Sequence, residues 1–88
     1  MMLKPEPESL PMGPLSMATL LTLEPAGLRR LLKSGLRGGL PHRDLEALLQ
    51  VEWQWSVQDW DAVALLEALE SRGWFLQNDE VWKTHLGG

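Results

Sequence analysis

The side chains most able to perform chemistry in this sequence are two pairs of carboxylates. Asp59 and Asp61 form one pair, and Glu67 and Glu70 form the other. Two neighbouring carboxylates can act as general acid and base. Acidic side chains on an exposed helix, however, more often form a solvated surface. We therefore expect neither pair to be catalytic.

Histidine offers no metal or catalytic site either. His42 and His85 lie far apart in a sequence without cysteine, which matches no zinc-ligand spacing. An ordinary exposed histidine is the expected role of His42. The basic, glycine-rich loop 33–39 follows a predicted helix and lacks the residue order of a phosphate-binding loop. No serine has a base at an interpretable spacing. We expect a protein that is not an enzyme and holds no metal or cofactor.

Tryptophan points to binding instead. The sequence has five, at Trp53, Trp55, Trp60, Trp74 and Trp82. Tryptophan dominates both cores and interfaces. A domain of 88 residues has too small a core to enclose all five fully, so we expect one or two to be exposed on the Trp53 to Trp60 side.

Charge is unevenly distributed along the chain, whose formal net charge is −4. Residues 25–50 carry five basic and two acidic side chains, whereas residues 57–88 carry six acidic and two basic ones. A body built from these halves would be electrostatically two-sided, which steers protein association more often than nucleic-acid recognition. Two solvated faces without a partner are an equally good interpretation.

The length allows one domain. Four prolines in residues 1–14 predict a flexible tail, either inert or ordering on a partner. The domain is expected over residues 15–85, and residues 86–88 as a frayed end. Residues 15–23 are apolar without a period, so a helix and an edge strand both remain open. With no membrane-spanning stretch, signal-peptide core or cysteine, we expect a soluble, cytoplasmic protein.

Apolar residues recur at helical spacing in three segments, about 25–34, 42–50 and 57–72. Between the second and third helices, apolar and polar residues alternate over 51–55, which predicts an extended segment. Ser56 followed by Asp59 resembles a capping box that starts the third helix at residue 57.

A β-hairpin is predicted after the third helix. Two β-prone runs flank Asn78 and Asp79, a favoured two-residue turn. Pairing across that turn places Phe75 opposite Trp82 and Leu76 opposite Val81.

Three helices followed by a hairpin, with ESRGW directly before the strands, resemble the winged-helix family. The resemblance covers residues 24–85. Its best part, ALLEALESRGWFLQNDEVWKT at residues 64–84, is similar to a recognition helix, a glycine stop and a wing. It implies a mainly α fold with a small β-hairpin, three helices and a C-terminal wing. Winged helices serve DNA regulators and purely protein-binding assemblies alike. The usual first strand would have only Leu40 and its neighbours to form it.

The third helix is acidic, unlike a DNA-reading helix. Its apolar face holds Ala62, Leu65, Leu66 and Leu69. The opposite side holds Asp59, Trp60, Val63, Glu67 and Glu70, with no lysine or arginine. Phosphates would be repelled there, because DNA affinity depends on basic side chains. We expect this side, together with Trp53 and Trp55, to bind a protein partner.

Three alternatives remain at this level. Trp60 could pack under residues 15–23 instead of being exposed. The chain could also be a DNA-binding transcriptional regulator that docks through the basic side of the first helix and nearby residues, namely Arg29, Arg30, Lys33, Arg37 and Arg43. A homodimer through the unpaired hairpin edge is a third arrangement. The preferred interpretation is a protein-interaction adaptor or regulator with nucleic acid disfavoured.

Overall fold

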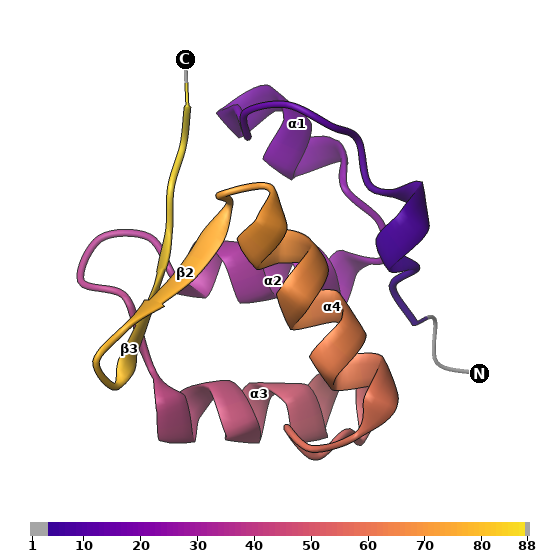
Figure 1. The fold of residues 1–88 in the computed structure, drawn as a ribbon, viewed down its shortest axis with the longest axis vertical. Coiled ribbons are helices and arrows are strands. Elements are labelled where there is room, and N and C mark those ends of the chain that lie inside the picture. Colours follow the sequence, from indigo (N-terminus) through magenta and orange to yellow (C-terminus); the bar gives the residue numbers. More distant parts are fainter. Residues whose placement is uncertain (1–3, 88) are drawn as a thin grey trace.

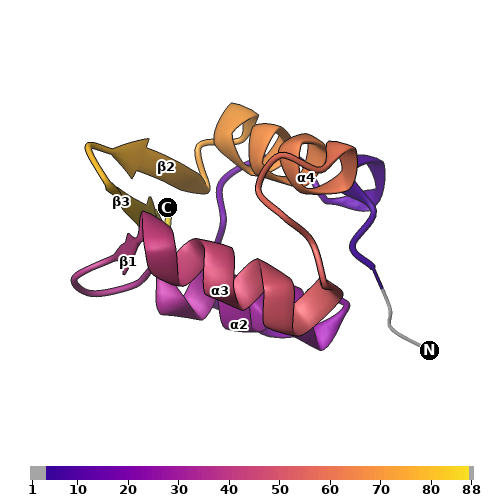
Figure 2. The same cartoon turned by 90° about the horizontal axis from the view of Figure 1, so that it is seen from below.

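Helices in two layers and a small sheet at one end build the fold (Figures 1 and 2). The computed structural model describes residues 4–87. In chain order its elements are η1 (Pro7–Ser9), α1 (Met17–Thr22), α2 (Ala26–Ser34), β1 (Leu40–Pro41), α3 (His42–Trp53), α4 (Trp60–Ser71), β2 (Phe75–Asn78) and β3 (Val81–Thr84). Figure 2 shows α4 in one layer and α2 with α3 in the other. The predicted helical fold with a β-hairpin is confirmed at this level.

Residues 15–23, left open between helix and strand, contain the helix α1. The Ser16 side chain accepts a hydrogen bond from the Thr19 backbone N–H at 3.0 Å, which caps the first turn. Leu20 is the buried residue of this helix. None of the helices in residues 4–87 has the length and apolar character needed to cross a membrane.

The helix α3 is longer than predicted and ends at Trp53. The predicted extended segment is therefore wrong for residues 51–53. Leu45, Leu49 and Trp53 are buried at successive four-residue steps, so Trp53 continues the apolar stripe of the helix. Gln54 then ends the helix in a left-handed conformation with φ of 58°.

The capping pair before α4 forms, but it closes a turn ahead of the helix. The Ser56 backbone N–H donates to the Asp59 carboxylate at 2.8 Å, and the Gln58 N–H donates to the Ser56 hydroxyl oxygen at 3.2 Å. Asp59 is consequently the residue that precedes the helix, and α4 begins at Trp60, later than the predicted start at residue 57.

The hairpin forms with a register different from the predicted one. Asp79 and Glu80 make the turn, with Asp79 at φ of 59°. Phe75 therefore pairs with Thr84, and Trp82 pairs with Gln77. The shift is an even number of residues, so each side chain keeps its predicted face. Phe75 and Trp82 still stack as diagonal neighbours, with ring centroids 5.2 Å apart.

A third strand completes the sheet. β1 pairs antiparallel with β3, so the strand order is β1-β3-β2. Leu40 lies opposite Trp82 in this pairing. The Thr84 N–H also donates to the Gly35 carbonyl at 2.8 Å. β3 thus pairs with a strand on each side, and β1 and β2 are the edge strands of the sheet.

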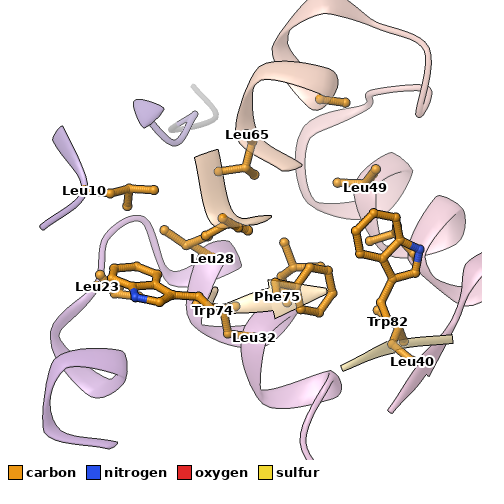
Figure 3. Packing of buried hydrophobic residues seen from close by; sticks show 14 of the residues in the cluster. Leu10, Leu23, Leu28, Leu32, Leu40, Leu49, Leu65, Trp74, Phe75 and Trp82 are labelled. Atoms are coloured by element: carbon orange, nitrogen blue, oxygen red, sulfur yellow. The ribbon is translucent and has the colours of Figure 1, made fainter. Parts of the chain in front are cut away.

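A single leucine-rich core joins these elements (Figure 3). Trp74 and Phe75 are its largest fully buried side chains. Leu10 and Leu15 from the N-terminal region belong to the same cluster. The core therefore includes residues from outside the three predicted helices and the hairpin.

Residues 4–14, hereafter the N-terminal strap, lie against α4 and Trp74, a placement that differs from the predicted flexible tail. Arg72 donates to the carbonyl oxygens of Leu10 and Pro11, and the Trp74 indole N–H donates to that of Gly13. Prolines remove backbone donors but keep their acceptors, so an extended proline-rich segment can still be held through its carbonyls. Residues 1–3 of the predicted tail, and residue 88 of the predicted frayed end, lie outside the described residues.

Candidate protein-interaction surface

One side of α4 presents the residues predicted to bind a partner. This surface, the α4 outer face, consists of Asp59, Trp60, Val63, Glu67 and Glu70. Val63 is half-buried, and the other four are exposed. The opposite side of α4 buries Ala62, Leu65 and Leu69 in the core. The predicted division of the helix into an inner and an outer side is confirmed.

Trp60 is the most exposed large apolar side chain in residues 4–87, with 89% of its surface accessible. The alternative in which Trp60 packs under residues 15–23 is therefore wrong. In Figure 1, α1 is on the side of the end of α4 that leads into β2, whereas Trp60 is the first residue of that helix, at its other end. Nothing in the core requires an indole at this position.

Trp53 and Trp55 do not belong to this surface. They are 4% and 5% exposed, and their ring centroids lie 5.0 Å apart. Trp53 is buried because α3 continues through it, and Trp55 packs beside it in the following loop. Their predicted place in the binding surface is therefore wrong, whereas the expectation of one or two exposed tryptophans on the Trp53 to Trp60 side is met by Trp60.

Charge on the α4 outer face is mostly uncompensated. The side chains of Glu67 and Glu70 have no hydrogen bond or ion pair with any residue in the range 4–87. A cation does approach one end, because Lys4 Nζ lies 4.0 Å from the carboxylate of Asp61. Both side chains of that pair are more than half exposed, so it contributes little. Asp61 is not one of the five residues of the α4 outer face, so this ion pair leaves the predicted absence of lysine and arginine from that face unchanged.

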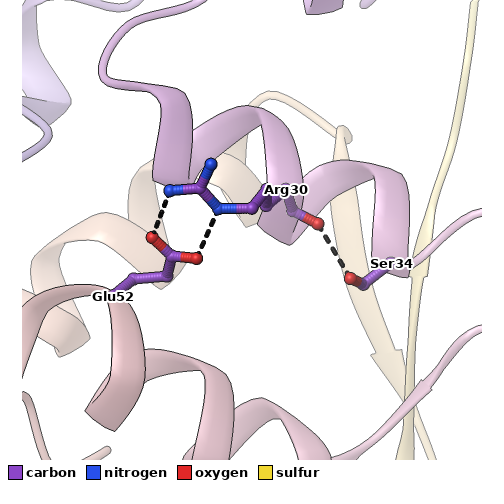
Figure 4. Close-up of polar contacts among 3 residues, drawn as sticks. All are labelled: Arg30, Ser34 and Glu52. Carbon is purple, nitrogen blue, oxygen red and sulfur yellow. Dashed lines mark hydrogen bonds and ion pairs between the residues drawn. The ribbon is translucent and has the colours of Figure 1, made fainter.

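The basic residues of the alternative DNA-binding surface are only partly free. Arg29 donates to the Leu23 carbonyl. Arg30 forms a bidentate ion pair with Glu52, with 2.5 Å from Nε to Oε2 and 2.6 Å from Nη2 to Oε1 (Figure 4). The remaining three, Lys33, Arg37 and Arg43, are exposed and have no ion pair within the described part of the chain. Two of the five predicted phosphate contacts are thus already engaged inside the protein.

The ion pair between Arg30 and Glu52 joins α2 to α3. Its hydrogen bonds lower the pKa of Glu52 from its ordinary value of 4.5. The charged form of Glu52 is therefore favoured in the folded protein. This contribution to stability is present above the unfolded-state pKa and is lost as the pH falls through the lower, folded-state pKa.

Glu52→Gln should therefore destabilise the protein at neutral pH, and the deficit should disappear in acid. We expect the melting temperatures of the variant and the wild type to differ at neutral pH and to converge in acid, as the pH falls through the lowered folded-state pKa of Glu52 and the carboxylate becomes protonated in the wild type. Thermal unfolding followed by circular dichroism measures both. Glu46→Gln makes the same charge change on α3 away from Arg30. A deficit that stayed constant with pH, or one shared by the control, would contradict this role for the ion pair.

The histidines are held by neighbours. The Trp82 indole N–H donates to His42 Nδ1 at 3.1 Å, and the His85 backbone N–H donates to the Trp74 carbonyl. Across residues 4–87, no group of three or more histidine, aspartate or glutamate side chains is arranged to hold a metal ion.

A scan against protein-family models, a search of the curated proteins and a search of the solved structures found no match to this chain.

Proposed function

We propose that this chain is a small, non-enzymatic winged-helix-like adaptor or regulator that binds a protein partner through the α4 outer face. The order α2–β1–α3–α4–β2–β3, with β3 between the other two strands, supports the winged-helix part of the proposal. In that arrangement α4 takes the position of the recognition helix and the β2–β3 hairpin that of the wing. We expect it to act in the cytoplasmic location that the sequence predicts.

The exposure of Trp60 is the observation that carries the proposal. An indole that is 89% exposed leaves a large apolar area in water, whereas burial of an aromatic side chain removes about 150–250 Å² from it. Tryptophan is enriched among the residues that dominate binding energy at interfaces. Val63 lies one helical turn further along on the same side and extends the apolar part of the surface.

Charge indicates the chemistry of the partner. Asp59 lies just before the apolar part of the face, and Glu67 and Glu70 follow it along the helix, all three exposed. A matching surface would offer an apolar pocket for Trp60 and lysine or arginine side chains around it. A phosphate backbone would meet the same carboxylates with repulsion.

Partner capture with matched variants tests the proposal. The tagged wild-type chain is used to isolate bound proteins, and one that is lost with Trp60→Ala is purified for calorimetry. Trp60→Ala should weaken its binding by about 30-fold or more, as for a hot-spot residue. Glu67→Lys should also weaken it by reversing a charge. Val51→Ser is the control, because Val51 is 74% exposed on α3 and lies outside the α4 outer face.

The proposal fails if folded Trp60→Ala and Glu67→Lys proteins retain every partner at wild-type affinity. The DNA-binding alternative predicts a different result. A mixed DNA pool would then bind at low salt, and affinity would fall steeply as salt is raised. That binding would be lost in Lys33→Ala and Arg37→Ala and unaffected by Trp60→Ala.

A further inference from the structure

The N-terminal strap is held by the burial of Leu10 in the core and by hydrogen bonds to its backbone carbonyls. Arg72 Nε donates to the Pro11 carbonyl at 3.0 Å and Arg72 Nη2 to the Leu10 carbonyl at 3.2 Å. The Trp74 indole N–H donates to the Gly13 carbonyl at 2.8 Å. The guanidinium also lies over the Trp74 ring, 5.9 Å from its centroid. An arginine and a tryptophan together thus hold three carbonyls of one extended segment.

Arg72 is itself fixed in place by α4. Its Nη1 donates to the Ala68 carbonyl at 3.0 Å, which orients the guanidinium towards the strap. Trp74 is 1% exposed and anchored in the core. The folded body therefore orients the Arg72 guanidinium through the Ala68 carbonyl, and Trp74 is part of the core.

These contacts favour a class of peptide segments rather than a single specific sequence. Backbone carbonyls are common to all peptides, and an extended proline-rich segment has few internal hydrogen bonds to occupy them. In the strap, the carbonyls of Glu6 and Pro7 accept bonds within η1, whereas those of Leu10, Pro11 and Gly13 accept from Arg72 and Trp74. Leu10 and Pro5 are the buried side chains of the strap. The side chains of Glu6, Glu8 and Met12 are exposed and could be replaced without loss of contact.

The strap also has features of a segment that can detach. Residues 11–14 are all exposed, and Gly13 has a φ of 98°, in the region that favours glycine. The ion pair of Lys4 with Asp61 is long and exposed. Segments with few buried side chains open at the low end of the local stability range.

We propose that the surface formed by Arg72 and Trp74 at the C-terminal end of α4 is a binding site for an extended proline-rich segment of a partner protein, and that the strap occupies it in the free chain as a tethered competitor. The site does not depend on the proposed function, because Arg72 contacts the strap on a side of α4 away from Trp60 and Glu67.

A labelled peptide tests the site directly. The probe is a fluorescent peptide with the sequence of residues 4–14, followed by fluorescence anisotropy. A full-length Leu10→Ser protein, whose own strap is weakened, should bind the probe. The wild type should bind it at least about tenfold more weakly, because its tethered strap competes at an effective concentration in the millimolar range. The same peptide with Leu10→Ser should not bind.

A second protein gives the same test if the Leu10→Ser variant misfolds. A protease site placed between Met12 and Gly13, both exposed, allows the strap to be cut after folding. The cut protein keeps Gly13 and Pro14, so it should exchange residues 4–12 for a labelled peptide of those residues. Adding Arg72→Ala should weaken probe binding to either protein, since two of the three carbonyl contacts come from Arg72.

A segment of a partner protein can occupy the site only if the site also binds peptides whose sequence differs from that of the strap. A peptide in which Glu6 and Glu8 are both replaced by serine should bind as well as the probe. Failure of the probe to bind either folded protein would overturn the site. Binding restricted to the chain's own sequence, or a wild type that dimerises in sedimentation by exchanging straps, would overturn the assignment to a partner protein.

Discussion

Trp74→Ala is expected to lower the free energy of unfolding by about 3 to 5 kcal/mol, the usual cost of removing a buried tryptophan. Trp74 is 1% exposed, and its indole N–H is bonded to the Gly13 carbonyl. An 88-residue domain has a total stability of about 4 to 13 kcal/mol by per-residue scaling. The substitution therefore removes a large part of the stability, and urea unfolding followed by circular dichroism measures it.

Trp60→Ala is the matched control for this change. The same side chain is removed from a position that is 89% exposed, so the free energy of unfolding should change by no more than about 0.5 kcal/mol. A loss at Trp60 comparable to that at Trp74 would mean that Trp60 is packed in the core. The α4 outer face would then have no exposed indole to offer.

Gly39→Ala should destabilise the protein by about 2 to 5 kcal/mol for two separate reasons. Gly39 has a φ of 91°, where a side chain adds about 1 to 2 kcal/mol of strain. A Cβ there would also lie 2.5 Å from Val81 Cγ1 and 3.1 Å from the Trp82 backbone oxygen. Crowding of this kind costs about 1 to 3 kcal/mol. Urea unfolding of the variant provides the measurement.

The adjacent glycine gives the control for Gly39. A Cβ added at Gly38 would meet no atom within 4 Å, and this residue has no positive φ. Gly38→Ala should therefore be neutral or should stabilise the protein by about 0.4 to 1 kcal/mol through the unfolded state. Equal losses at both positions would contradict the close approach of residue 39 to β3.

Helical periodicity was enough to predict the helices and the sides of α4. Ala62, Leu65 and Leu69 follow one stripe, and that stripe is buried as expected. The prediction of an extended segment around Trp53 was wrong because a short alternation of apolar and polar residues fits a strand and a helix end equally well. The four-residue steps from Leu45 through Leu49 to Trp53 were the signal that could have extended α3.

Long-range pairing was beyond local patterns. Two overlapping turns, at residues 78–79 and 79–80, are both compatible with the hairpin, and tertiary packing selects the second. β1 has two residues and exists because β3 pairs with it. The proline content of the strap does not indicate which backbone carbonyls accept hydrogen bonds. The contacts of Arg72 with the carbonyls of Leu10 and Pro11 therefore could not be predicted from the sequence.

For the candidate site, sequence patterns predicted which residues share a side of α4 but not which tryptophans are exposed. Periodicity places Trp60 outside, and the structure agrees. Exposure of Trp53 and Trp55 depended on where α3 ends, which the sequence placed too early. The pairing of Arg30 with Glu52 joins residues on separate helices and required the packing of α2 against α3.

The Trp60 indole N–H reports most directly on the central claim that a protein docks on the α4 outer face. In the free chain, NMR should show this proton exchanging rapidly with solvent, in contrast to the buried Trp74. Addition of the purified partner should shift the Trp60 signal and slow its exchange. An unchanged Trp60 signal at saturating partner, with the shifts confined to residues around Lys33 and Arg37, would contradict the account.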